Sequence, residues 1–358
     1  MARRSIVKVS SLGKAMRPLQ FDRNFAHLPF APLFLSSVSK ESAKPTMRRL
    51  RETRDFGPNP GELRMLTYAP RRLKAGAPLV VVLHGCRQDA AMYLQGTGWP
   101  MLAEQMGFVL LAPEQTRTNN MRGCFNWFLP GDTQRDQGEA ASIAQMIRTA
   151  AAQYRTDVSR VFVCGLSAGG AMTSVMLATY PEMFNAGAII AGLPYGAANS
   201  VPEALISMKH MPSRTPHEWG DRVRAASDYS GKRPRVSVWY SDADETVHHS
   251  NADAIIGQWT DVMGLEEQPS VTETVVGYPH NVWRDKAGTA VLESYLINGL
   301  AHGTPILTEG NDACGMPAPF ILEAGISSTV RIARFWGLTK RPRGLVRRVL
   351  DSLLLRSA

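Results

Sequence analysis

The chain has 358 residues, of which 44% are hydrophobic and 20% charged, with 30 Gly and 23 Pro. It lacks an apolar run approaching the roughly 18 residues of a membrane helix, so the composition excludes both a membrane-spanning and a disordered protein. A chain of this length can bury one large core or two ordinary ones.

The formal net charge of +9 is concentrated at the two ends of the chain. Residues 1–55 hold 12 Lys and Arg against 4 Asp and Glu, residues 339–358 hold 6 against 1, and residues 56–338 hold 22 against 26. The central part is therefore mildly acidic, which argues against a nucleic-acid partner. We expect 1–55 to be a flexible basic leader, 56–338 the folded domain and 339–358 a basic tail. Contact of these ends with a membrane or granule surface is the alternative to simple solvation.

The first 40 residues contain no recognisable export signal. The opening MARRSIVKVSSLGKAMRPLQ is basic but lacks a continuous apolar segment, and the apolar stretch at 28–38 is interrupted by Pro29 and Pro32. The turn-rich sequence FGPNPGE then leads into the first expected strand, at 61–70.

From residue 79 onward, short apolar runs alternate with helical patterns. The runs are typical of strands covered on both faces, and lie at 79–83, 108–111, 161–164, 187–191, 236–239 and 291–297. The helical patterns lie at 138–154, 168–180, 251–263 and 327–338. This alternation predicts an α/β fold: a mostly parallel central sheet with helices on both faces and the chemistry in loops at the carboxyl ends of the strands.

The sequence GLSAG at 165–169 follows an expected strand directly and precedes an expected helix. In this context G-x-S-x-G predicts a sharp turn that presents a nucleophilic serine, Ser167. The alternative is a glycine-rich turn whose serine only caps the helix. A phosphate-binding loop is disfavoured because the sequence has no GKS or GKT.

A serine nucleophile requires a histidine base oriented by a carboxylate, and in this type of fold the acid and the histidine follow the serine in that order. The loop SDADETV after the strand at 236–239 offers candidate acids. We favour Asp244, because several residues of loop are needed to turn its side chain toward the base. Asp242, at the strand end, is the main rival.

The base is expected to be His302, because it follows the last core strand and should lie above the sheet near the serine. His280 lies between hairpin-like segments, where a packing role is favoured. His248 and His249 follow the acid loop and are expected to open the next helix.

Ester hydrolysis also requires two N–H donors for the developing oxyanion. The amide after the nucleophile, that of Ala168, is one candidate. The loop after the first core strand, His84-Gly85-Cys86, offers the Cys86 amide as the second. We expect His84 to brace this loop through its ring nitrogens.

Three further residues near the expected site invite an interpretation. Trp127 is either a buried plug or a substrate-binding wall, Cys124 could form a disulfide with Cys86, and Glu139 is expected to play a structural part at a helix N-terminus. No two of the four cysteines form a CxxC pair, which disfavours a metal site.

Taken together, these motifs resemble the poly(3-hydroxybutyrate) depolymerase family of esterases. The resemblance rests on HGC at 84–86, CFNWF at 124–128, GEAASI at 138–143, GLSAGGAM at 165–172, DADETV at 242–247, GLAHGTP at 299–305 and the closing stretch 312–338.

The resemblance implies an α/β-hydrolase fold and a Ser167-His302-Asp244 triad that needs no cofactor or metal. It also implies hydrolysis of short-chain polyhydroxyalkanoates, such as poly(3-hydroxybutyrate) or its oligomers. The resemblance favours a location outside the cell, and the cytoplasm is the alternative because no clear export signal is found. The alternatives are a carbohydrate esterase of the feruloyl or acetylxylan type and a non-catalytic granule-binding protein.

Overall fold

The computed structural model describes residues 47–339, and the fold given below is that of this part of the chain. Its strands are β1 (Arg51–Thr53), β2 (Arg64–Tyr68), β3 (Leu79–Leu83), β4 (Val109–Glu114), β5 (Val161–Leu166), β6 (Ala186–Ile190), β7 (Arg235–Tyr240), β8 (Val271–Val275), β9 (Tyr278–Arg284), β10 (Ala290–Leu296), β11 (Thr304–Ile306) and β12 (Ile321–Glu323). Its helices are α2 (Ala90–Thr97), α3 (Trp99–Met106), α4 (Pro130–Thr133), α5 (Gly138–Tyr154), α6 (Ala168–Thr179), η1 (Pro181–Met183), α7 (Val201–Lys209), α8 (Pro216–Arg224), α9 (Ser250–Met263) and α10 (Ser328–Phe335).

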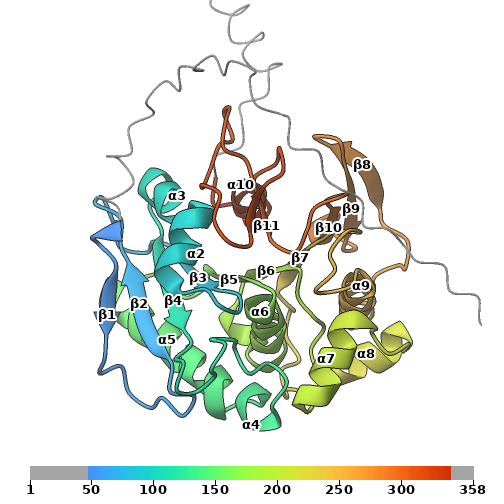
Figure 1. Cartoon of the computed structure of the whole chain (residues 1–358), viewed down its shortest axis with the longest axis horizontal. Coiled ribbons are helices and arrows are strands. Elements are labelled where there is room, and N and C mark those ends of the chain that lie inside the picture. Colours follow the sequence, from blue (N-terminus) through green and yellow to red (C-terminus); the bar gives the residue numbers. More distant parts are fainter. Residues whose placement is uncertain (1–46, 340–358) are drawn as a thin grey trace, which may run out of the picture. The chain divides into compact units, whose positions relative to one another are not determined.

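A central sheet organises the fold, with strand order β1-β2-β4-β3-β5-β6-β7-β10-β9-β8 (Figure 1). The strands from β4 across to β10 pair in parallel, whereas β1, β2, β8 and β9 add antiparallel edges. The small parallel pair β11-β12 is separate from this sheet. The predicted fold class is therefore confirmed.

Strand β3 is apolar at every position because both of its faces are buried. Leu79, Val81 and Leu83 pack in a core with residues of α5, α6 and α9, whereas Val80 and Val82 pack in a second core with residues of α2, α3 and α10. Figure 1 shows these two groups of helices on opposite sides of the sheet. Successive side chains of a strand point to opposite faces, so both faces of β3 are covered.

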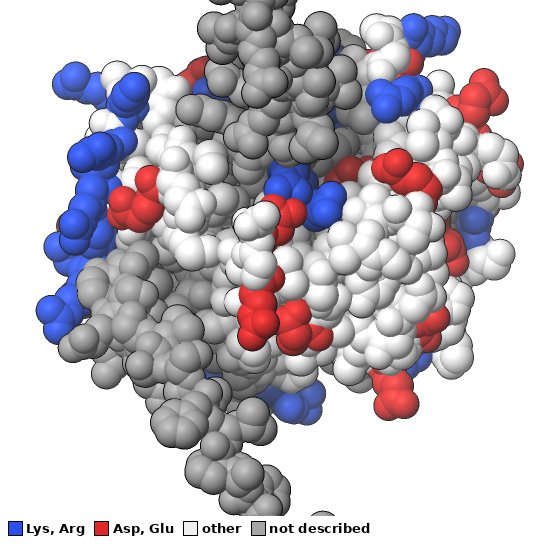
Figure 2. Space-filling view, turned by 90° about the horizontal axis from the view of Figure 1, so that it is seen from above, with Lys and Arg blue, Asp and Glu red and all other residues white. Residues whose placement is uncertain are grey.

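The predicted leader 1–55 extends too far along the chain. Its residues Arg51–Thr53 form β1, which pairs with β2 and is held there by an ion pair between Glu52 and Arg64 at 2.9 Å. Because β1 is an exposed, charged edge strand, no apolar alternation marks it in the sequence. Figure 2 shows Lys and Arg side chains gathered on the side of the molecule where β1 lies. The rest of the leader, 1–46, and the basic tail from 340 to 358 lie outside the described residues.

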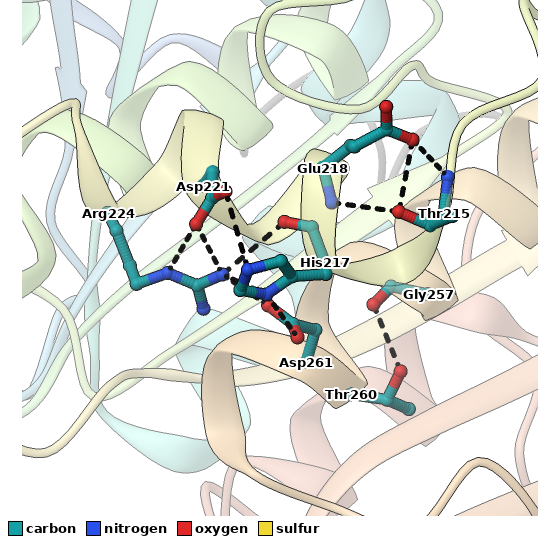
Figure 3. A network of polar contacts seen from close by, with 8 residues as sticks. All are labelled: Thr215, His217, Glu218, Asp221, Arg224, Gly257, Thr260 and Asp261. Atoms are coloured by element: carbon teal, nitrogen blue, oxygen red, sulfur yellow. Dashed lines mark hydrogen bonds and ion pairs between the residues drawn. The ribbon is translucent and has the colours of Figure 1, made fainter.

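Helix α8 packs on α9 through a polar network that connects the chain between β6 and β7 to the helix after β7 (Figure 3). Arg224 of α8 pairs with Asp261 of α9 at 2.6 Å, and His217 lies 3.4 Å from the same carboxylate. A Cβ on Gly220 would lie only 1.9 Å from an Asp261 oxygen, so a larger residue at this position would displace the Asp261 carboxylate from the network. The network fixes α9, which begins just after the candidate acid loop.

No helix within residues 47–339 combines the length and apolar character needed to cross a bilayer.

Candidate active site

Ser167 lies at the turn between β5 and α6, with φ 57° and ψ −118°. Non-glycine residues rarely adopt such a positive φ, and it is typical of a strained turn that exposes a nucleophile. The Ser167 N–H donates to the Ile190 carbonyl at 2.9 Å, and its carbonyl accepts from the Ala171 N–H at 2.8 Å. Hydrogen bonds to both neighbouring elements therefore maintain the strained backbone.

The glycines of the GLSAG motif are required by close backbone packing. A Cβ on Gly165 would lie 2.3 Å from the Gly169 carbonyl oxygen, and a Cβ on Gly169 would lie 2.3 Å from the Leu83 carbonyl oxygen. Helix α6 thus begins directly against the end of β3. This contact brings Ser167 beside the loop that follows β3.

The structure brings His302 and Asp244 together. His302 Nδ1 lies 2.6 Å from Asp244 Oδ2, and the two side chains are 9% and 2% exposed. The other carboxylate oxygen, Oδ1, accepts from the N–H groups of Thr246 at 2.8 Å and Val247 at 2.9 Å. Buried Val247 re-anchors the loop, so Asp244 is held with one oxygen free to orient the imidazole.

Asp242, the rival acid, binds a different part of the chain. Its carboxylate accepts from the Gly299 N–H at 2.7 Å and from Asn298 Nδ2 at 3.0 Å. These hydrogen bonds lower the pKa of Asp242 below its ordinary value. Asp242 therefore fastens the loop that leads to His302 and makes no contact with the imidazole in the described structure.

A small pocket is lined both by the acid of this pair and by a residue that binds the serine turn. It is lined by the ends of β6 and β7 and by the loop around His302, including Ile190, Ala191, Asp244, Ala301 and Gly303. Ile190 is also the residue whose carbonyl accepts from the Ser167 N–H. The carboxylate of this pair and the strand end that binds the serine turn therefore border the same pocket, at the carboxyl edge of the parallel sheet.

In the loop after β3, several N–H groups have protein acceptors in the described structure, but that of Cys86 does not. The N–H groups of Gly85, Arg87 and Gln88 donate to Gln88 Oε1, the Arg122 carbonyl and the Gly85 carbonyl, respectively. Between residues 47 and 339, the Cys86 N–H has no such acceptor, and neither has the N–H of Ala168 at the start of α6. A Cβ on Gly85 would lie 3.4 Å from the Leu166 carbonyl oxygen, so the loop lies against the serine turn. Two free amides thus flank the serine turn.

His84 braces this loop from a fully buried position. Its Nδ1 lies 2.9 Å from the Gly85 carbonyl oxygen, and its Nε2 accepts from the Gln115 N–H at 3.1 Å. The ring must therefore carry its proton on Nδ1 and remain neutral, and burial lowers the pKa of His84 accordingly. His84 connects the loop after β3 to the end of β4.

A disulfide between Cys86 and Cys124 closes the same region. The two cysteines are separated by 38 positions in the sequence. Closing a loop of that length stabilises the folded state by about 4 kcal/mol when the effect is assigned to the entropy of the unfolded chain. The bond ties the loop after β3 to the loop after β4.

Trp127 is only 7% exposed and packs in the core with α5 and α6. Its ring also makes an edge contact with Phe128, with centroids 5.3 Å apart. Such a position offers little surface to a substrate, so the structure favours the plug over the substrate-binding wall.

The other candidate histidines have different partners. His280 lies within β9, buried between Glu273 at 3.0 Å and Glu293 at 3.2 Å. His248 lies 2.9 Å from the Ser250 hydroxyl, and His249 is the residue before α9. None of these side chains contacts Asp244 in the part of the chain that the structure describes.

Sequence motifs do not predict the buried polar network that contacts the disulfide loop. Glu139, on the first turn of α5, is completely buried and accepts hydrogen bonds from the Asn126 N–H, Gln115 Nε2 and Asn119 Nδ2. Burial, together with the nearby Asp132 carboxylate, raises the pKa of Glu139 to about 8, although these hydrogen bonds oppose the shift. Gln115 and Asn119 belong to no recognisable sequence motif, so their hydrogen bonds to Glu139 are known only from the structure.

Residues 47–339 contain no group of three or more His, Cys, Asp or Glu side chains arranged to hold a metal ion. The chemistry that the site offers is that of a serine, an imidazole, a carboxylate and free backbone amides.

Comparison with known proteins places this geometry in a family. Residues 65–272 match the family model described as esterase PHB depolymerase. The chain is 42% identical to poly(3-hydroxyalkanoate) depolymerase C of Paucimonas lemoignei over 313 residues, covering 87% of this chain and 74% of that protein. It is 33% identical to feruloyl esterase B of Neurospora crassa over 287 residues, covering 76% and 94%. Among solved structures, an acetyl xylan esterase from Aspergillus awamori superposes with a TM-score of 0.69 at 26% identity, covering 81% of this chain and 99% of the other.

Gly169→Ala tests the packing that supports the serine turn. The added methyl would overlap the Leu83 and His84 carbonyl oxygens, which belong to backbone and cannot swing away. We expect a loss of at least about 1–3 kcal/mol in the free energy of unfolding, measured by urea denaturation. Gly131→Ala is the matched control, because a Cβ there meets no atom within 4 Å. Equal stability of the two variants would contradict the analysis.

Glu139→Gln tests the buried carboxyl group through the pH dependence of stability. In the unfolded chain Glu139 loses its proton near pH 4.5, whereas the folded protein keeps it until about pH 8. Its contribution to stability is complete below pH 4.5 and decreases as the pH rises to 8, by at most about 1.4 kcal/mol per pH unit. Glutamine does not titrate, so the variant should lose less stability over this range. Urea unfolding of both proteins at pH 5, 6.5 and 8 measures the difference, and parallel pH profiles would contradict the shifted pKa.

Proposed function

The chain belongs to the esterase PHB depolymerase family, and from this premise we propose that it hydrolyses esters with Ser167 as nucleophile, His302 as base and Asp244 as the orienting acid. The observation that carries the proposal is the 2.6 Å contact between His302 Nδ1 and Asp244 Oδ2, at the sheet edge where Ser167 is held in its strained turn. Membership in this family makes the protein a carboxylic ester hydrolase, which leaves the non-catalytic granule-binding alternative without support.

The proposed reaction is acyl transfer in two steps. His302 Nε2 takes the proton from Ser167 Oγ, and the oxygen attacks the ester carbonyl carbon. The carbonyl oxygen becomes an oxyanion that accepts from the N–H groups of Cys86 and Ala168. The C–O bond to the alcohol breaks, and His302 returns its proton to the leaving alcohol. Water, deprotonated by His302, then attacks the acyl-enzyme and releases the acid and Ser167.

The proposed substrates are short-chain polyhydroxyalkanoates, such as poly(3-hydroxybutyrate), or their oligomers. The support is the 42% identity to a poly(3-hydroxyalkanoate) depolymerase over 87% of this chain, against 33% for a feruloyl esterase. The superposition on an acetyl xylan esterase favours a sugar ester as the second candidate. The Cys86–Cys124 disulfide supports action in an oxidising compartment, such as outside the cell.

Substitutions in the proposed triad should separate the two candidate acids. Ser167→Ala is expected to reduce kcat on a p-nitrophenyl acyl ester by at least about 10³-fold, and Asp244→Asn by up to about 10⁴-fold because the imidazole tautomer is lost. Asp242→Asn should stay within about tenfold of the unsubstituted protein, since that carboxylate binds Gly299 rather than His302. Full activity of Ser167→Ala would refute the assignment of Ser167 as the nucleophile. A larger loss of kcat in Asp242→Asn than in Asp244→Asn would show that Asp242 is the acid that orients the base.

A substrate panel should decide between the polyester and the sugar ester. The purified protein is expected to release hydroxybutyrate from amorphous poly(3-hydroxybutyrate) and from its soluble oligomers, measured by chromatography of the products. Feruloylated and acetylated xylo-oligosaccharides serve as the competing substrates, and Ser167→Ala is the control for each. Turnover of the sugar esters alone would agree with the proposed mechanism but would show that the substrate is a sugar ester rather than a polyester.

A further inference from the structure

The proposed mechanism uses no atom of Glu139, although this side chain is completely buried and lies at the centre of a polar network. It extends from the first turn of α5 toward the two loops that the Cys86–Cys124 disulfide joins. A buried carboxyl group is costly, and an apolar side chain of similar volume is often at least as stable in such a position. The hydrogen bonds that the carboxyl group makes must therefore offset this cost.

Three N–H donors converge on the Glu139 carboxyl group. Oε1 accepts from Gln115 Nε2 and from Asn119 Nδ2 at 3.3 Å, and Oε2 accepts from the Asn126 backbone N–H at 2.8 Å. All three donors belong to the segment that leads from β4 around the disulfide loop. A single side chain of α5 thus fixes this segment on both sides of Cys124.

The network reaches Cys86 by two routes. Gln115 Nε2 also donates to the Cys124 carbonyl at 2.9 Å, and Cys124 is bonded covalently to Cys86. The backbone N–H of Gln115 donates to His84 Nε2, and the same ring contacts the Gly85 carbonyl. The first route ends at the Cys86 side chain, and the second at the Gly85 carbonyl, which belongs to the same peptide group as the free Cys86 N–H.

We propose that Glu139 is a positioning residue for the oxyanion hole, because it fixes the Cys86 N–H through Gln115 and the Cys86–Cys124 disulfide. This inference rests on the proposed function, in which the Cys86 amide stabilises the oxyanion. Donors of this kind act only when they are preorganised for the developing charge. A loop released from Glu139 would keep its fold and its substrate contacts but would lose that alignment.

Glu139→Gln is the variant that tests the proposal. Because both carboxyl oxygens accept N–H groups, the new NH₂ must face at least one donor in either orientation of the amide. We expect kcat on a p-nitrophenyl acyl ester to decrease by about tenfold or more, while KM stays within about twofold, since loss of a complete oxyanion donor costs about 10²- to 10³-fold. An increase in KM with unchanged kcat would overturn the proposal.

Glu293→Gln is the matched control for general destabilisation. Glu293, on β10, is also buried, at 5% exposure, and binds the Ser237 hydroxyl of β7 and His280 of β9, without a link to Cys86. We expect its kcat to stay within about twofold of the unsubstituted protein at a temperature well below the melting temperature of both variants. Equal losses of kcat in the two variants would indicate a merely structural role for Glu139.

A double-mutant cycle with Cys124→Ser tests the route of the effect. If Glu139 acts through the disulfide, the fold-loss of kcat in the double variant Glu139→Gln/Cys124→Ser should be much smaller than the product of the two single fold-losses. Fully multiplicative losses would show that Glu139 and the disulfide act independently, and would overturn the proposed route.

Asn119→Ala provides a second variant if Glu139→Gln does not fold. It removes one of the three donors at a partly exposed position and should lower kcat in the same direction but less. An unchanged kcat in this variant would count against the proposal. Failure of the proposed function is distinguishable, because Ser167→Ala would then remain active, whereas failure of this inference leaves Ser167→Ala inactive and Glu139→Gln fully active.

Discussion

The strained backbone of Ser167 is the constraint on which the rest of the site depends. A non-glycine residue at φ 57° and ψ −118° costs about 1–3 kcal/mol, and it persists only where the surrounding structure over-determines it. Here the constraint comes from three strands at once. Gly165 belongs to β5, Gly169 lies against the end of β3, and Ile190 at the end of β6 accepts from the Ser167 N–H. The sheet therefore holds Ser167 in place at its carboxyl edge.

The loops at that edge are fastened to one another rather than only to the sheet. Asp242 holds the loop before His302, His84 connects the ends of β3 and β4, and the Cys86–Cys124 disulfide joins the loops that follow these two strands. The His84 tie is buried and the disulfide is covalent, so solvent weakens these two little, whereas the Asp242 hydrogen bonds are exposed. A site built in this way keeps its groups aligned before the substrate arrives, which is the condition for electrostatic stabilisation of a transition state.

The same scaffold occurs in proteins that are named for different esters. This chain matches a polyhydroxyalkanoate depolymerase and a feruloyl esterase in sequence, and an acetyl xylan esterase in structure. The substrates in these names share the ester bond and differ in their acyl and alcohol parts. The scaffold accounts for what they share, while substrate choice depends on the surface around the site.

The sequence by itself determined the α/β fold, because strands covered on both faces must be apolar throughout and alternate with helices. It also identified the serine, because only small neighbours tolerate that turn. It could not show β1, whose exposed edge carries no apolar pattern. It favoured Asp244 over Asp242, but the two lie two residues apart in one loop and only the contact with His302 distinguishes them. The tertiary structure decided these points, together with the contacts of Glu139, because contacts such as that between Asp244 and His302, 58 residues apart, depend on how the strands are ordered in the sheet.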